Sequence, residues 1–170
     1  MSRRPPSRQG GVRVSEEFVA TNPGADPTVT ELVINLLVTA TLLEGKLDRL
    51  LKESRLTVGS FNVLSVVAGD PEPLTPSEIA ARIAVPVTTA TVTSVLDTLE
   101  RNGYIERRPH PSDRRRLLIQ LTRDGRRAHA EVVPRVLKGE KKWTAALSGP
   151  ARARLTDGLA ALQEDLRAPD

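Results

Sequence analysis

Residues 101–127 read RNGYIERRPHPSDRRRLLIQLTRDGRR. Two short apolar runs, one around Ile105 and one from Leu117 to Leu121, flank a segment of Pro, Ser, Asp and Arg that cannot pack in a core. This pattern predicts a β-hairpin with a charged tip. The stretch holds nine arginines and three acidic residues, a net charge of +6, whereas the whole chain carries +4. A hairpin with a cationic tip is suited to contact an anion, and the commonest long anion is nucleic acid.

Local capping signals predict a series of helices before this hairpin. Leucines at three- and four-residue steps predict a long helix from Thr28 to about Ser54. A second helix is expected to start after Thr57, which is a suitable N-cap. The segment Thr75-Pro76-Ser77-Glu78 combines an N-cap, a proline at the first helical position and a glutamate at the third, which is a capping box. A fourth helix is expected over about residues 88–102.

The same kinds of signal predict the elements that follow. Gly103 is expected to end the fourth helix, and Thr122 is expected to cap a helix that runs to about Leu147 with a kink at Pro134. Ser148 is expected to start the last helix, on which leucines line one face. Helix, short turn, helix and basic hairpin is the order of elements in a winged helix-turn-helix.

The composition excludes several other functions. The chain has no cysteine, which rules out disulfides and thiolate metal sites, and its two histidines make a poor metal set. No catalytic triad, paired-carboxylate constellation or Gly-rich phosphate loop is evident, so we do not expect an enzyme. The chain shows no secretory signal, and its most apolar window, Leu32–Leu43, is expected to be too short to span a bilayer. We therefore expect no cofactor, no metal, no membrane partner and a cytoplasmic location.

Three motifs carry a resemblance to a known family. They are TPSEIAARI at residues 75–83, VLDTLERNGYI at residues 95–105, and the hairpin sequence from Pro111-Ser112-Asp113-Arg114-Arg115 to Leu121-Thr122 and Gly125. Together they resemble the MarR family of winged-helix transcriptional regulators, over about residues 30–168. The resemblance implies a mainly α fold (α+β), a winged helix-turn-helix with long N- and C-terminal dimerisation helices. It also implies a sequence-specific, ligand-responsive repressor.

The resemblance further implies a division of the chain. Residues 1–27 are rich in proline and glycine and are expected to form a flexible basic arm. Residues 28–54 and 123–168 would form a helical dimerisation region, and residues 55–122 the DNA-binding lobe. The homodimer would bind a pseudo-palindromic operator in double-stranded DNA. Relatives often bind a small aromatic or phenolic effector, but the sequence does not show which residues would line such a pocket.

The fourth helix is expected to enter the major groove of DNA. Val92, Val95, Leu96 and Leu99 share one face, which must pack inward. The opposite face carries small hydroxyl and methyl groups, which can bond base edges or touch thymine methyls. The candidate base-reading residues are Thr88, Thr89, Ala90, Thr91, Thr93 and Ser94. Thr75 and Ser77, at the start of the third helix, are candidate contacts to the DNA backbone.

The hairpin, or wing, is expected to contact the minor groove and the phosphates. The resemblance implies that Arg115 enters the minor groove and that Asp113 braces the tip. Narrow A·T-rich minor grooves have a deepened negative potential that favours arginine. The candidate wing residues are Arg107, Arg108, His110, Ser112, Asp113, Arg114, Arg115 and Arg116.

Two alternatives remain open at this point. The chain has no basic residue between Arg82 and Arg101, so most of the fourth helix lacks positive charge. A protein-interaction module that kept the fold but lost sequence-specific DNA binding would show the same feature. Salt dependence separates the two, because a protein that neutralises several phosphates loses affinity steeply as salt rises. An enzyme is the third hypothesis, and it lacks a candidate nucleophile or acid–base pair.

Overall fold

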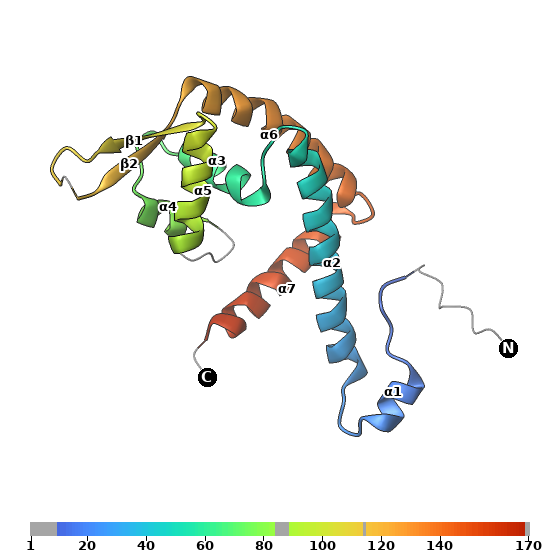
Figure 1. The fold of residues 1–170 in the computed structure, drawn as a ribbon. Helices are drawn as coiled ribbons and strands as arrows, with labels where there is room; N and C mark the ends of the chain where they lie inside the picture. The colour runs from blue at the N-terminus through green and yellow to red at the C-terminus, as the bar shows by residue number, and fades with distance from the viewer. Residues whose placement is uncertain (1–9, 84–88, 114, 169–170) are drawn as a thin grey trace. The chain divides into compact units, whose positions relative to one another are not determined.

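The computed structural model describes residues 10–83, 89–113 and 115–168. The described part is mainly helical with one two-stranded antiparallel sheet (Figure 1), which confirms the expected class. The chain divides into two compact units, Met1–Lys46 and Leu47–Asp170. This boundary falls inside a helix, whereas the sequence suggested one between residues 54 and 55.

In the N-terminal unit, an extended segment is hydrogen-bonded to helix α2, which spans Pro27–Lys52. The Val12 N–H donates to Asn35 Oδ1 at 2.7 Å, and Asn35 Nδ2 donates back to the Val12 carbonyl at 2.8 Å. The Val14 N–H donates to Glu31 Oε1 at 2.9 Å, and Arg13 forms an ion pair with the same carboxylate at 2.6 Å. These bonds, led by that of the Val14 N–H, hold the pKa of Glu31 below its usual value.

The same segment leads into the short helix α1, Glu16–Thr21. Ser15 caps this helix and accepts a hydrogen bond from the Phe18 N–H at 3.2 Å. Side chains of α2 therefore hold the backbone before α1, in the stretch that the sequence assigned to a flexible arm. Residues 1–9 lie outside the described residues.

Helix α2 exposes an unusual amount of apolar side chain. Between residues 27 and 46 its exposed large apolar residues are Val29, Leu32, Val33, Leu37, Val38, Leu42 and Leu43. By length and composition alone, this helix could cross a membrane: it has 26 residues, and its most apolar window has a mean hydropathy of 1.3 and no buried residue. The helix extends past Leu32–Leu43 at both ends, so it is longer than the apolar window on which the sequence expectation rests.

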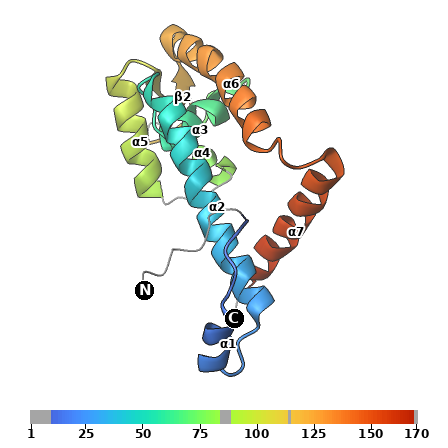
Figure 2. The same cartoon turned by 90° about the vertical axis from the view of Figure 1, so that its right-hand side faces the viewer.

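The C-terminal unit begins with three helices whose predicted starts are confirmed. Helix α3, Val58–Ala68, is capped by Thr57, whose hydroxyl accepts from the Ser60 N–H at 3.1 Å. Helix α4, Pro76–Arg82, has the complete capping box of Thr75 and Glu78. Helix α5 spans Thr89–Arg101. These three helices lie side by side (Figure 2).

The hairpin consists of β1, Ile105–Pro109, and β2, Leu117–Leu121, paired antiparallel with Ile105 opposite Leu121. Ile119 of β2 also bridges to Leu74, just before α4, through two backbone hydrogen bonds of 2.7 and 3.1 Å. The base of the hairpin is therefore built into the lobe, whereas its tip extends away from the helices.

Two helices complete the C-terminal unit. Helix α6, Arg123–Trp143, is capped by Thr122 as predicted and continues through Pro134, ending four residues before the predicted Leu147. Helix α7, Gly149–Arg167, starts at the predicted cap Ser148 and has no buried residue.

One aliphatic core joins α3, α4, α5, α6 and the hairpin. The sequence predicted four inward-facing residues on α5. Three of them, Val92, Leu96 and Leu99, are buried in this core, and Val95 is partly buried against it. The complete buried set is Leu51, Leu56, Val63, Leu64, Val67, Leu74, Ile79, Val92, Leu96, Leu99, Ile105, Ile119, Leu121, Val132 and Val136. This core holds α5 and the hairpin in one lobe.

Candidate nucleic-acid interface

Helix α5 has the two faces that its sequence predicts. Its buried apolar face packs on α3 and α4. Four of the predicted base-reading residues are exposed on it: Ala90, Thr91, Thr93 and Ser94. Thr88 lies outside the described residues, and the side chain of Thr89 is likewise not described. Gly103 follows the helix with φ +73°, the left-handed conformation that a glycine C-terminal signal predicts.

The tip of the hairpin is a tight turn organised by Asp113. Its carboxylate Oδ1 accepts the Arg115 N–H at 3.0 Å, and its carbonyl accepts the Arg116 N–H at 3.0 Å. The His110 N–H closes the turn by donating to the Arg116 carbonyl at 3.0 Å. These bonds fix the backbone on which Arg115 and Arg116 stand, which is a structural basis for the bracing expected of Asp113.

His110 and Ser112 contact each other within this turn. Nδ1 of His110 accepts the Ser112 N–H at 3.2 Å and lies 3.2 Å from the Ser112 hydroxyl. In the neutral imidazole the proton is therefore on Nε2, which leaves that nitrogen as a donor. Both residues shape the tip, and neither is buried.

The structure separates the arginines of this region by their partners. Arg107 pairs with two carboxylates of α5, and Arg108 pairs with Glu106 of its own strand at 2.7 Å. Glu106 also accepts from the Gln120 amide across the hairpin, and this bond, followed by the charge of Arg108, lowers the pKa of Glu106. Arg107 and Arg108 thus both have carboxylate partners in the structure, and their predicted contacts to DNA stay predictions.

Arg115 and Arg116 are exposed, and neither forms an ion pair with any of the described residues. The charge of Arg116 contributes to a lowered pKa of Glu78, although hydrogen bonds from Thr75 are the larger cause. Arg114, the remaining predicted tip residue, lies outside the described residues. Among the described arginines of the two strands and their turn, those without an ion pair lie at the tip and the paired ones lie nearer the base.

The start of α4 forms the capping box that the sequence predicts. Thr75 is only 4% exposed, and its N–H and hydroxyl both donate to Glu78 Oε2 at 2.7 Å. The capping box thus engages the N–H and hydroxyl of Thr75, whose predicted contact to the DNA backbone stays a prediction. Ser77, in the first turn of α4, is exposed and stays a candidate backbone contact.

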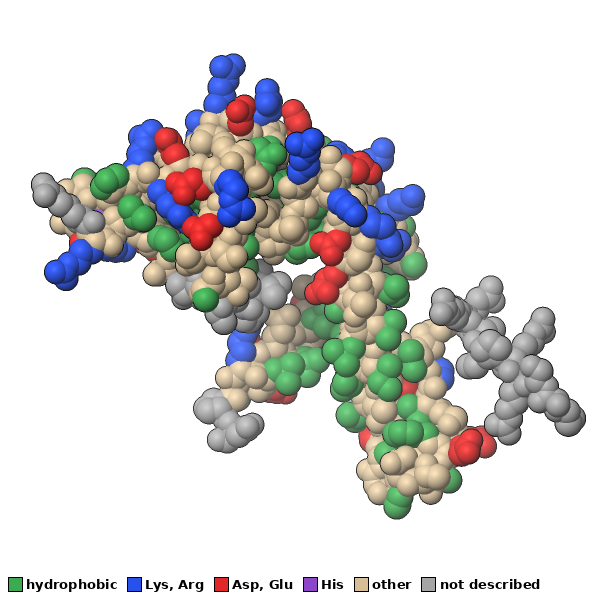
Figure 3. All heavy atoms as spheres, in the orientation of Figure 1, with side chains coloured by type: hydrophobic (Ala, Val, Ile, Leu, Met, Phe, Trp, Pro, Cys, Tyr) green, Lys and Arg blue, Asp and Glu red, His purple; other side chains and the backbone are tan. Residues whose placement is uncertain are grey.

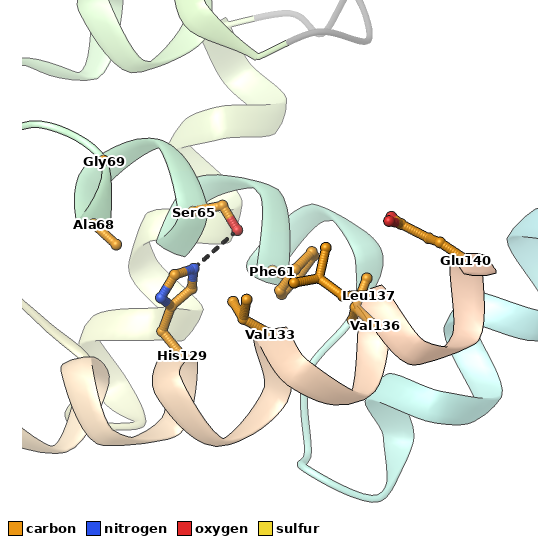
Figure 4. A pocket seen from close by; sticks show the side chains of 9 residues that line it. All are labelled: Phe61, Ser65, Ala68, Gly69, His129, Val133, Val136, Leu137 and Glu140. Carbon is orange, nitrogen blue, oxygen red and sulfur yellow. Dashed lines mark hydrogen bonds between the residues drawn. The ribbon is translucent and has the colours of Figure 1, made fainter. Parts of the chain in front are cut away.

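A second feature of this unit is a cavity of about 330 Å³ between α3 and α6 (Figure 4). His129 lies in it with Nε2 3.2 Å from the Ser65 hydroxyl, and its ring stacks on Phe61 with 6.1 Å between centroids. Burial lowers the pKa of His129. The lining residues are Phe61, Ser65, Ala68, Gly69, His129, Val133, Val136, Leu137 and Glu140.

Sequence reasoning did not place this cavity. Phe61 packs against the core while one side of it faces the cavity. Phe61 and His129 are 68 positions apart, and no local pattern brings them together. Among the described residues there is also no group of three or more His, Cys, Asp or Glu that could hold a metal ion.

The fold and this surface define a winged helix-turn-helix protein. The chain matches the MarR family over residues 56–116. It is 31% identical over 120 residues to the HTH-type transcriptional repressor YetL of Bacillus subtilis (strain 168), covering 69% of this chain and 70% of YetL. The chain belongs to the MarR family, and it is a transcriptional regulator rather than an enzyme.

Solved structures show the same fold. AbsC, a MarR family regulator of Streptomyces coelicolor, superposes with a TM-score of 0.78 at 20% identity, covering 86% of this chain and 99% of AbsC. The organohalide-sensing regulator RdhR, solved in a form bound to 2,4-dichlorophenol, superposes with a TM-score of 0.74 at 18% identity, covering 84% of this chain and 86% of RdhR.

Proposed function

We propose that this regulator is a repressor that binds double-stranded DNA with α5 in the major groove and the hairpin tip in the minor groove. The observation that carries the proposal is the exposed pair Arg115 and Arg116, which the Asp113 turn presents without an ion-pair partner among the described residues. The small side chains on the exposed face of α5 permit close approach to base edges. Arginine suits a narrow minor groove because of its negative potential.

The repressor acts as a homodimer in this proposal. Neither α7 nor the N-terminal part of α2 buries a residue, although both carry large apolar side chains. Figure 3 shows these green side chains along α2. An apolar surface of this kind on a lone chain promotes association. Two-fold symmetry would then present two α5 helices to half-sites about 34–36 Å apart.

A second copy of the chain, rather than a lipid bilayer, is the proposed cover of α2. The helix carries Asn35 and Glu31 within its apolar half, and both side chains bind the backbone of residues 12–14. In a hydrocarbon layer those polar groups and the arm would have to be desolvated together, which is costly. We accordingly place the protein in the cytoplasm, where its DNA lies.

The cavity between α3 and α6 is the proposed effector site, for a small aromatic or phenolic compound. Its walls are apolar apart from Ser65, His129 and Glu140, so a ring would pack against Phe61 and Val133 while a hydroxyl bonds to His129. A protein of the same fold, RdhR, binds 2,4-dichlorophenol. The effector would release DNA only if it binds better to the conformation that does not fit the operator.

Selection of genomic DNA fragments by the purified protein tests the proposal. We expect recovery of one pseudo-palindromic sequence. Weak binding without sequence preference would contradict the proposed DNA binding. It would favour the alternative of a protein-interaction module, which the absence of positive charge on most of α5 suggests.

The effector site has its own test with 2,4-dichlorophenol as the probe. We expect saturable binding by calorimetry that a His129→Leu change weakens, together with release of the selected DNA fragment. Equal binding by the wild type and His129→Leu would place the ligand elsewhere.

A further inference from the structure

Arg107 joins the two DNA-binding elements of the lobe. From β1, its Nη2 lies 2.6 Å from Asp97 Oδ1 and its Nη1 lies 3.0 Å from Glu100 Oε2, both on α5. The Arg107 side chain is 23% exposed, against 48% for Asp97 and 40% for Glu100. The guanidinium is therefore the most enclosed member of a three-residue cluster.

The geometry of the cluster suits an arginine better than a lysine. Asp97 and Glu100 are three positions apart, so their side chains stand one turn apart on the same face of α5. A planar guanidinium can donate from two nitrogens at once to two separate carboxylates, whereas an ammonium is a single point of charge. The two nitrogens of Arg107 thus link β1 to two points on α5.

The cluster also changes the charge of α5. Without Arg107, two carboxylates would stand unpaired on the helix that is proposed to enter the major groove. Unpaired negative charge beside phosphates is repulsive and lowers affinity. Arg107 therefore has two effects on the same surface, one geometric and one electrostatic, and neither requires it to touch DNA.

We propose that Arg107 is a positioning residue that sets α5 relative to the hairpin and masks the carboxylates of Asp97 and Glu100. The inference rests on the proposed function, since it concerns how the lobe meets DNA. It replaces a direct phosphate contact by Arg107 with an indirect role through α5.

Arg108 is the matched control on the same strand. It carries the same charge, but its partner Glu106 is also on β1, and its side chain is 61% exposed. It cannot join two elements. Its removal should therefore leave the placement of α5 unchanged.

The test is a double-mutant cycle read by affinity for the selected operator at several salt concentrations. We expect Arg107→Ala to weaken binding about tenfold in the wild-type background, the size of a typical coupling between contacting residues. In the Asp97→Ala, Glu100→Ala background the same change should have little effect. The slope of log affinity against log salt should stay the same within each background.

A direct phosphate contact predicts a different pattern. Arg107→Ala would then cost the same factor in both backgrounds and would reduce the salt slope by about 0.9, the value for one phosphate of duplex DNA. That result would overturn the inference. A loss of operator affinity that a smaller folded fraction of Arg107→Ala explains would also overturn the inference. Thermal unfolding of each variant measures that fraction.

Arg107→Lys covers the case in which Arg107→Ala does not fold. Lysine keeps the charge, so a phosphate contact would survive, whereas the two-carboxylate cluster would not. We expect Arg107→Lys to bind the operator about tenfold more weakly, and Arg108→Lys to bind like the wild type. Near-normal binding by Arg107→Lys would overturn the inference. Absence of any operator preference in the wild-type protein would instead contradict the proposed function, and the inference with it.

Discussion

The hairpin and helix α2 are both unusual surfaces for a single chain, and they are unusual in opposite ways. Among the described residues of the hairpin, Arg107 and Arg108 near the base pair with carboxylates, and Arg115 and Arg116 at the tip form no ion pair. In α2, large apolar side chains are exposed on residues 29–43, with polar contacts limited to the segment that precedes α1. Unpaired cations need an anion and exposed apolar groups need an apolar partner, so the two surfaces point to different partners.

The largest expected effect concerns the junction that anchors the hairpin to the lobe. A Cβ added at Gly125 would lie 1.9 Å from the Tyr104 carbonyl oxygen, so backbone must move. We expect Gly125→Ala to lower the free energy of unfolding by about 3 kcal/mol, at the upper end of overpacking effects. Urea unfolding measures this.

Gly158→Ala is its control, because nothing lies within 4 Å of an added Cβ on that exposed helix. Alanine there should stabilise by about 0.5–1 kcal/mol, as it does within helices. Equal midpoints for the two variants would show that the close approach at Gly125 is not a constraint.

The next effect tests the apolar surface. Leu37 is 65% exposed on α2, and a glutamate there would be buried against an apolar partner in the proposed dimer. Loss of one leucine contact costs about 2 kcal/mol, or about thirtyfold in the dissociation constant, and two-fold symmetry can repeat it. Sedimentation velocity of Leu37→Glu should show a shift to monomer. Lys46→Glu, on the same helix, is the control. If Leu37→Glu forms dimers as readily as Lys46→Glu, this part of α2 is not at the interface.

A similar effect on DNA binding is expected at the tip. Arg115→Ala should weaken operator binding by about 1–3 kcal/mol, the value for one specific contact. Arg127→Ala is the control, since Arg127 is on α6 and pairs with Asp124 at 3.2 Å. Fluorescence anisotropy with the selected operator measures both. Equal losses would indicate that only overall charge matters.

The smallest effect concerns pH. Burial lowers the pKa of His129, so the unfolded chain takes up a proton at a higher pH than the folded chain. The free energy of unfolding should therefore fall as pH decreases through about 6.5, the ordinary histidine value, and level off below the lowered one. His129→Gln should show a smaller fall between pH 7.5 and 5.5. An unchanged fall in this variant would assign the effect to other groups.

Much of the fold could be predicted because its signals are local. Caps such as Thr57 and Thr75 act on N–H groups three residues away, and the hairpin follows from two apolar runs and the turn between them. The pairing of Asn35 with Val12 could not be predicted in this way, since it spans 23 positions. The structure shows the Asn35 side chain holding this backbone segment.

The candidate site divides along the same line. Sequence reasoning found the exposed face of α5 and the Asp113 turn, which depend on helical periodicity and on contacts within three residues. It assigned Arg107 and Thr75 to DNA because charge and position suggested it. In the structure Arg107 pairs with carboxylates of α5, and Thr75 is bonded to Glu78 within its own capping box. Counting cations therefore overestimates those available to a ligand, and only their partners show which are free.

The salt dependence of operator affinity is the most direct measurement of the proposed role. If the unpaired tip arginines and α5 bind duplex DNA, log affinity for the selected operator should fall linearly with log salt, by about 0.9 for each phosphate neutralised. The operator should also be preferred over a scrambled duplex at every salt concentration. A slope near zero, or equal affinity for both duplexes, would contradict sequence-specific DNA binding by this surface.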